Sequence, residues 1–201
     1  MLRCIIEKTH NVTCYSELGV ISIKKFHEVS KDNRTLVDDV IEKNFLLPIA
    51  SQYLNTSYNF PISQDTTSFF YNLYDKFFIL SKELFGNFTT TEKNINTCWV
   101  YRSNKNDFNS VWHDHSCTST INGVYYYQID NNGIIFKSNG KTRSYLPEQE
   151  ELIIFPNDLI HKPEITTSTN WRYSVNMEIL TEEPSSKLFE KYLNGFSQGN
   201  S

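Results

Sequence analysis

The chain has 201 residues, of which 39% are apolar and 14% aromatic, so it is too hydrophobic for a disordered protein and long enough to bury a core without disulfides. Its formal net charge of −4 argues against nonspecific nucleic-acid binding, which requires a basic surface. The local basic cluster of Lys137, Lys141 and Arg143 fits a solvated hairpin instead. No stretch approaches the roughly 18 apolar residues of a membrane span. We therefore expect one globular domain over residues 1–201 that binds neither nucleic acid nor membrane.

The four cysteines (Cys4, Cys14, Cys98 and Cys117) lack the C-x-x-C spacing of redox or zinc sites. Nothing near Met1 resembles a signal peptide, because the first apolar run is short and charges follow it. Both features fit a cytoplasmic protein with reduced thiols.

The first elements expected along the chain are short strands and a helix. Alternating runs within residues 3–29 predict a strand or two at the edge of a sheet. Apolar residues then recur at helical spacing over residues 34–46, behind a cap at Asp32 or Asn33, and Pro48 marks the stop.

A second and stronger helix is predicted from about Thr66 to Phe85. Residues 65–67 supply its cap and Gly86 its end. Its aromatic residues recur on one face, which predicts packing against the core and not a cofactor site.

The second half of the chain reads as strands, with a short helix at about 185–193. The strands are predicted at residues 97–103, 119–130, 133–138, 151–155 and 171–180. The segment Asp130–Gly133 has the composition of a hairpin turn. We therefore expect a mainly β fold with flanking helices: N-terminal helical support over about 1–95, a β core over about 96–180, and a helix and tail over 181–201.

Three histidines form the most informative motif. Side chains two apart on a strand point the same way, so His113 and His115 can face one ion. His161 follows an apolar strand and a turn, which can bring in a third imidazole. Three neutral imidazoles suit iron, zinc, copper or nickel and do not suit calcium or magnesium.

The order of motifs resembles a known superfamily. The motifs are His113-x-His115, Asn122-Gly-Val-Tyr-Tyr-Tyr127, Leu152-Ile-Ile-Phe-Pro156 leading to His161, and Arg172-x-Ser174-x-Asn176. Together they resemble the iron(II)- and 2-oxoglutarate-dependent oxygenases, and more narrowly the uncharacterised 2-oxoglutarate oxygenases of bacteria and tailed phages. The resemblance covers about residues 97–180. It implies a double-stranded β-helix, the jelly-roll or cupin-like barrel, and a phage-encoded protein would act in the host cytoplasm.

The resemblance also implies a metal-ligand set. His113 and His161 fall on its two histidine ligands, whereas His115 occupies the position of the usual Asp or Glu. We expect His115 to be the third ligand. Asp114 would replace it only if the strand bulges there, because regular alternation points Asp114 away.

The implied cosubstrate site lies further along the chain. Arg172 falls where the superfamily holds the distal carboxylate of 2-oxoglutarate, and Ser174 on the same strand face can donate a further hydrogen bond. Tyr125 and Tyr127 share a strand face and are candidates for a hydroxyl or a wall of the pocket. Fe(II), 2-oxoglutarate and O₂ would together hydroxylate an unactivated carbon, releasing succinate and carbon dioxide.

Two other functions remain open. A three-histidine dioxygenase would bind its substrate directly to iron without 2-oxoglutarate, and a non-catalytic metal-binding jelly-roll module would have kept only the fold. Specificity is expected in the loops, here residues 103–112 and 47–65. The sequence leaves open whether the substrate is a small molecule or a peptidyl side chain, and whether the chain is a monomer or a homodimer.

Overall fold

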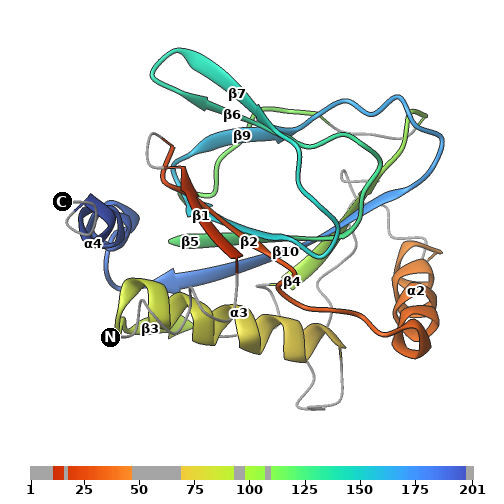
Figure 1. Cartoon of the computed structure of the whole chain (residues 1–201), viewed down its shortest axis with the longest axis horizontal. Helices are drawn as coiled ribbons and strands as arrows, with labels where there is room; N and C mark the ends of the chain where they lie inside the picture. The colour runs from red at the N-terminus through yellow and green to blue at the C-terminus, as the bar shows by residue number, and fades with distance from the viewer. Residues whose placement is uncertain (1–10, 16–17, 47–68, 93–97, 107–109, 198–201) are drawn as a thin grey trace.

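The computed structural model describes residues 11–15, 18–46, 69–92, 98–106 and 110–197 of the chain. Within these residues, two antiparallel β-sheets stack on each other and helices flank the larger sheet (Figure 1). The predicted mainly β class with flanking helices is therefore confirmed. No helix among the described residues is long and apolar enough to cross a membrane.

The larger sheet runs in the order β1-β2-β8-β5-β10-β3, with β4 also paired to β10. Its strands are β1 (Asn11–Tyr15), β2 (Val20–Lys24), β3 (Thr90–Glu92), β4 (Cys98–Ser103), β5 (Ile121–Gln128), β8 (Leu152–Pro156) and β10 (Arg172–Thr181). The smaller sheet has the order β7-β6-β9, with β6 (Ile134–Ser138), β7 (Lys141–Tyr145) and β9 (Ile160–Pro163). The first two strands extend the larger sheet, so the segment before residue 96 supplies strands as well as helical support.

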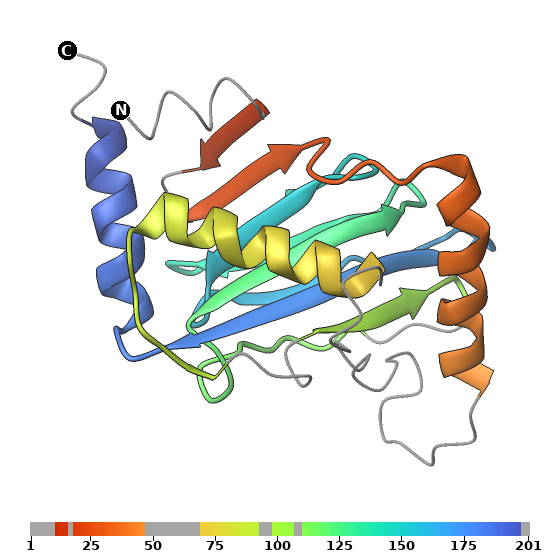
Figure 2. The same cartoon turned by 90° about the horizontal axis from the view of Figure 1, so that it is seen from below.

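Helix α3 (Phe69–Phe85) lies across the outer face of the larger sheet (Figure 2). Its predicted apolar stripe is buried, with Leu73 and Phe77 fully inaccessible to solvent. Phe77 sits against Gly123 of β5, where a Cβ would come within 2.6 Å of its ring. Glycine at this position therefore lets the helix approach the sheet closely. Gly86 ends the helix at φ +81°, as predicted.

Helix α2 (Lys31–Leu46) begins earlier than the apolar pattern predicted. The Ser30 hydroxyl accepts a hydrogen bond from the Asn33 amide, so Ser30 is the N-cap and the cap expected at Asp32 or Asn33 is wrong. Val37 and Ile41 are buried. Pro48 and the expected cap at 65–67 lie outside the described residues.

Helix α4 (Ser185–Ser197) begins where the sequence predicted it and continues past residue 193. It packs against α3, where Phe85 and Phe189 bring their rings to 4.6 Å. The C-terminal element thus closes the helical side of the fold and does not reach the space between the sheets.

The predicted hairpin at Asp130–Gly133 is wrong. Strand β5 pairs with β8 and β10, while β6 pairs with β7 and β9, so this segment crosses from the larger sheet to the smaller one. The hairpin of this region is instead β6–β7, and it carries the exposed basic cluster of Lys137, Lys141 and Arg143. No strand was predicted at the positions of β7 and β9.

A second, smaller core fills part of the space between the sheets. It contains residues from the larger sheet, such as Val124 and Phe155, and from the smaller sheet, such as Ile134 and Phe136. Beside it the two sheets enclose a cavity of about 500 Å³, bounded by β4, β5, β10, β6 and β9. The candidate site lies in this cavity.

Candidate metal centre

The backbone brings two distant histidines together. The His113 amide donates to the His161 carbonyl at 3.0 Å, and the His161 amide donates to the His113 carbonyl at 2.9 Å. This antiparallel bridge places a loop residue beside β9. The His115 amide donates to the Asn157 carbonyl at 2.8 Å and fixes the same loop two residues later. The expected regular strand at 113–115 is therefore wrong, and hydrogen bonds to the β8–β9 region hold the pair instead.

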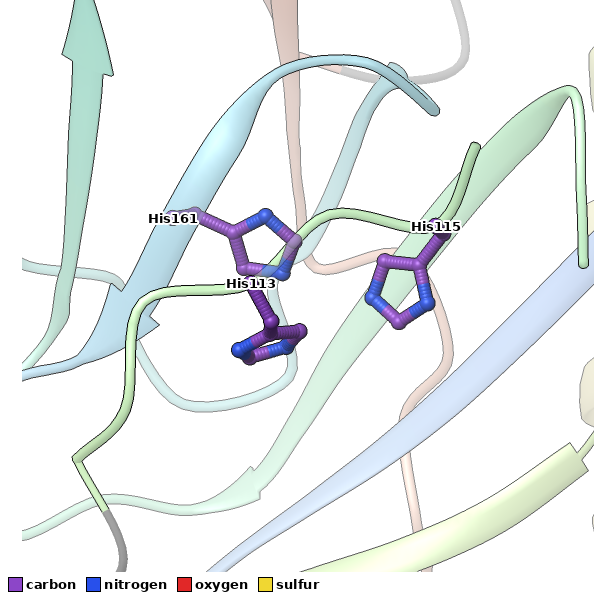
Figure 3. A group of neighbouring side chains, drawn as sticks. All are labelled: His113, His115 and His161. Atoms are coloured by element: carbon purple, nitrogen blue, oxygen red, sulfur yellow. The ribbon is translucent and has the colours of Figure 1, made fainter. Parts of the chain in front are cut away.

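The three imidazoles converge on one place (Figure 3). Their ligand-capable nitrogens all lie within 4.8 Å of one another. The His161 ring is buried against Phe155, whose centroid is 4.7 Å away, while His113 and His115 lie nearer the opening. The sequence prediction that His113, His115 and His161 meet in space thus agrees with the geometry.

Each ring has its Nδ1 atom occupied by an acceptor. Nδ1 of His113 lies 2.9 Å from the Val111 carbonyl, and Nδ1 of His161 lies 2.8 Å from the Leu159 carbonyl. Nδ1 of His115 lies 2.7 Å from a Glu178 carboxylate oxygen. Carbonyl and carboxylate oxygens only accept, so Nδ1 carries the proton in all three rings. In the neutral form of each ring the Nε2 lone pair is then free, which is the arrangement that metal-ligating histidines usually have.

Burial keeps the deeper rings neutral. It lowers the pKa of His161 to about 3, with a further contribution from His113. Burial also lowers the pKa of His113. A metal therefore meets little competition from protons for these two rings at neutral pH.

Asp114, the alternative to His115, is not part of the cluster. Its side chain is exposed, and its carboxylate accepts a hydrogen bond from the Ser116 amide at 3.1 Å. The side chains that lie close enough to hold one metal ion are His113, His115 and His161, without Asp114, as the preference for His115 over Asp114 predicted.

Arg172 lies in the same cavity as the histidines and is only 2% exposed. Its Nη1 donates to the carbonyls of Asn132 and Gly133 at 3.1 and 3.0 Å. Gly133 is required here, because a Cβ would come within 1.8 Å of the Tyr145 carbonyl oxygen. The crossover segment between the sheets thus holds the guanidinium by its backbone.

No carboxylate in the described part of the chain pairs with Arg172. Two nearby acidic residues have other contacts: Glu164 accepts from the Gly133 amide and the Ser144 hydroxyl, and Glu178 contacts His115. Burying a guanidinium without an anion costs free energy of folding, and a negatively charged ligand in the cavity would offset that cost.

The β5 tyrosine that faces the cavity is not one of those predicted. Tyr126 lines the cavity opposite Ser174, whereas Tyr125 and Tyr127 point to the helical side. The Tyr125 hydroxyl donates to the His27 carbonyl, and the Tyr127 hydroxyl donates to Asp38 at 2.8 Å. The prediction for Tyr125 and Tyr127 is therefore wrong, because β5 is buried on both faces and its composition does not reveal which face is which.

The rest of the cavity wall was predicted only in part, since Val111 falls in the segment 103–112 that was expected to set specificity. Trp99 and Tyr101 of β4 line the cavity beside Asn176, and Val111 lies at its opening. Regular alternation along β10 would have indicated Asn176 and Glu178, since both share the strand face of Arg172 and Ser174. Nothing in the sequence around Trp99 and Tyr101 indicates that they line a cavity. Of the segments expected to set specificity, 47–65 lies outside the described residues.

No family model matches the chain, and no curated protein matches its sequence. Among solved structures, AviO1 from Streptomyces viridochromogenes Tue57 superposes with a TM-score of 0.62 at 10% identity, over 85% of this chain and 93% of AviO1. EvdMO1 superposes with a TM-score of 0.60 at 12% identity, over 84% of this chain and 49% of EvdMO1. The chain therefore spans about half the length of EvdMO1. These likenesses establish the fold alone.

An oxidoreductase of the 2OG-Fe(II) oxygenase family from Burkholderia pseudomallei also shares part of the architecture. Its TM-score is 0.37 at 14% identity, over 46% of each chain. A likeness this partial does not bear on function, which depends on the geometry of the cavity.

Proposed function

We propose that this protein is an Fe(II)- and 2-oxoglutarate-dependent dioxygenase built on a double-stranded β-helix. The observation that carries the proposal is the buried, anion-free guanidinium of Arg172 in one cavity with three imidazoles whose Nε2 atoms are free. A metal site and an anion site in one enclosed space fit a ligand that chelates the metal at one end and carries a carboxylate at the other. 2-Oxoglutarate has this form.

The residues fit a divalent transition metal. Neutral imidazole is a ligand for iron, and His113, His115 and His161 would supply three. Bound iron would supply the activation of O₂ coupled to decarboxylation of 2-oxoglutarate, with hydroxylation of an unactivated carbon and release of succinate and carbon dioxide as the expected outcome.

The protein's own part is to bind the cosubstrate and exclude water. Arg172 would hold the distal carboxylate through its planar fork of donors. Ser174 and Tyr126 face each other across β10 and β5, and both hydroxyls can donate to the same carboxylate. Val124 and Ile134 form apolar walls around this end of the cavity and keep water away from the ion pair.

The remaining space would receive the substrate. Trp99, Tyr101 and Val111 also line the cavity, and the Trp99 ring lies 6.2 Å from that of His115, so the substrate carbon would approach the metal beside Trp99. We propose a small molecule or a peptidyl side chain as the substrate.

The test is a titration of 2-oxoglutarate into the anaerobic Fe(II)-loaded protein. We expect a metal-to-ligand charge-transfer band in the visible range. Arg172→Met should weaken 2-oxoglutarate binding by about 100-fold, because charge-assisted hydrogen bonds contribute about 1.5–3 kcal/mol each. Iron affinity should remain unchanged. The matched control is Arg143→Met on the exposed β7 strand, which should change neither affinity.

The other outcomes separate the rival functions. Iron binding without the charge-transfer band would exclude a 2-oxoglutarate enzyme and leave a three-histidine dioxygenase or a non-catalytic module. Where the band does appear, succinate release under air separates turnover from binding alone.

A further inference from the structure

Strand β10 carries a line of polar side chains along its cavity face. Arg172, Ser174 and Asn176 line the cavity, and Glu178 follows two residues later beside His115. Alternation along a strand places all four on the same side. The line therefore runs from a buried cation at one end to a buried carboxylate at the other.

Glu178 is a buried carboxylate, and His115 is the one basic side chain that pairs with it in the described part of the chain. It is 6% exposed, and one carboxylate oxygen receives both the Thr118 hydroxyl at 3.0 Å and Nδ1 of His115 at 2.7 Å. In the described part of the chain no Lys or Arg forms an ion pair with it. Burying a carboxylate in this way is costly unless a positive charge lies close by. A metal ion on Nε2 of His115 would be that charge, on the other side of the same ring.

The charge at the proposed metal centre leads to the same residue. A facial triad of two histidines and one carboxylate reduces the charge of a divalent ion from +2 to +1. Three neutral histidines leave it at +2. Glu178 places one negative charge close to the proposed metal position, separated from it only by the imidazole ring of His115.

We propose that Glu178 replaces the carboxylate that the ligand set lacks, acting through the Nδ1–H of His115. This inference rests on the proposed function, since it requires a metal on the three histidines. Glu178 is a positioning residue. It fixes the tautomer and orientation of His115, makes Nε2 a stronger donor, and stabilises the higher charge of the metal.

The first test is the metal affinity of Glu178→Gln, measured by anaerobic Fe(II) or Co(II) titration without 2-oxoglutarate. Glutamine keeps the shape and an acceptor oxygen but removes the charge. We expect affinity to fall by about 10–100-fold, the range typical for residues that support a metal ligand. The Fe(III)/Fe(II) potential should rise, because the missing negative charge disfavours Fe(III).

Two control variants isolate the charge. Thr118→Val removes the other hydrogen bond to the same carboxylate oxygen and should lower metal affinity by no more than about fivefold, as expected for a neutral hydrogen bond. Glu182→Gln removes an exposed carboxylate four residues further along the chain and should have no effect.

The stability of the metal-free protein distinguishes this role from a structural one. Glu178→Gln should leave the melting temperature of the metal-free protein unchanged or raise it, because it removes a poorly compensated buried charge. A loss of metal-free stability with unchanged metal affinity and unchanged potential would overturn the inference.

A measurement on the unaltered protein covers the case in which the variant does not fold. In the Zn(II)-loaded protein, imidazole ¹⁵N NMR should show His115 protonated at Nδ1 and metal-bound at Nε2. Coordination through Nδ1 would overturn the inference, since Glu178 occupies that side. If the unaltered protein binds no divalent transition metal, the proposed function fails, and this inference fails with it.

Discussion

The two faces of β5 carry similar residues but differ in how fully their polar groups are paired. On the helical face, the hydroxyls of Tyr125 and Tyr127 donate to His27 and Asp38. On the cavity face, Tyr126 is 3% exposed, and no acceptor among the described residues receives its hydroxyl. One strand thus presents a satisfied face and an unsatisfied face.

The same contrast extends to the neighbouring strand. On the cavity face of β10, Arg172 has no carboxylate partner and the Asn176 amide nitrogen has no acceptor in the described part of the chain. Buried polar groups in folded proteins are normally hydrogen-bonded and buried charges normally paired, so an unpaired amide nitrogen and a guanidinium without a counter-ion on one cavity face indicate a missing ligand. The helical face therefore contributes to the stability of the fold. The cavity face leaves polar groups without protein partners, and these groups can bind a ligand.

The largest expected effect concerns the helical face. Phe77→Ala should destabilise the protein by about 3–5 kcal/mol, because Phe77 is fully buried and Gly123 offers no side chain to fill the space. Urea unfolding measures this change. Ile79→Ala, at an exposed position of the same helix, should cost no more than about 0.5 kcal/mol. A folded Phe77→Ala protein that had lost its affinity for 2-oxoglutarate would show that the two faces do not act separately.

The next effect concerns acid stability and lies on the cavity face. Burial lowers the pKa of His161 from its ordinary value of 6.5 to about 3 in the folded protein, so between these limits only the unfolded state takes up the proton. Stability of the metal-free protein should fall as pH falls below about 6.5, by up to about 1.4 kcal/mol per pH unit from this residue. Thermal unfolding of metal-free protein between pH 7 and 5 measures the slope.

His161→Phe provides the matched variant, because the ring lies among the aromatic rings of Phe136 and Phe155. Its slope with pH should be shallower, although His113, whose pKa is also lowered by burial, should leave part of it. An unchanged slope would mean that the acid sensitivity arises elsewhere in the chain.

Periodicity predicted most elements of the fold because the helices and long strands are amphipathic or strongly apolar. Helix α3 and strands β5, β8 and β10 were found within a few residues of their ends. The pairing of strands was not predictable at Asp130–Gly133, where turn-forming residues fit a crossover as well as a hairpin. Strands β7 and β9 are short and polar, so their alternation gives little signal.

The candidate site was predictable where a residue motif indicates a ligand. It was not predictable where the answer depends on which face of a strand a side chain occupies. The convergence of His113, His115 and His161 followed from their spacing and the strand before His161. The choice of Tyr126 over its neighbours did not, because β5 is buried on both faces and both carry tyrosine. A register shift between β5 and β10 at Tyr173 and Ser174 adds an irregularity that no sequence pattern indicates.

The smallest and most specific effect compares Tyr126 and Tyr127, which lie on opposite faces of β5, by removing the hydroxyl from each. Tyr126→Phe should weaken 2-oxoglutarate binding by about fivefold to tenfold, because it removes one hydrogen bond of about 1–1.5 kcal/mol to the carboxylate. Its stability should stay the same, since the hydroxyl forms no hydrogen bond among the described residues. Tyr127→Phe should do the opposite. It leaves Asp38 without its donor, so stability should fall by about 1 kcal/mol while 2-oxoglutarate affinity stays unchanged. Chemical unfolding measures the stability of both variants, and calorimetric titration measures their 2-oxoglutarate affinity. If Tyr127→Phe weakened binding and Tyr126→Phe weakened stability, the proposed position of 2-oxoglutarate on the cavity face of β5 would be wrong.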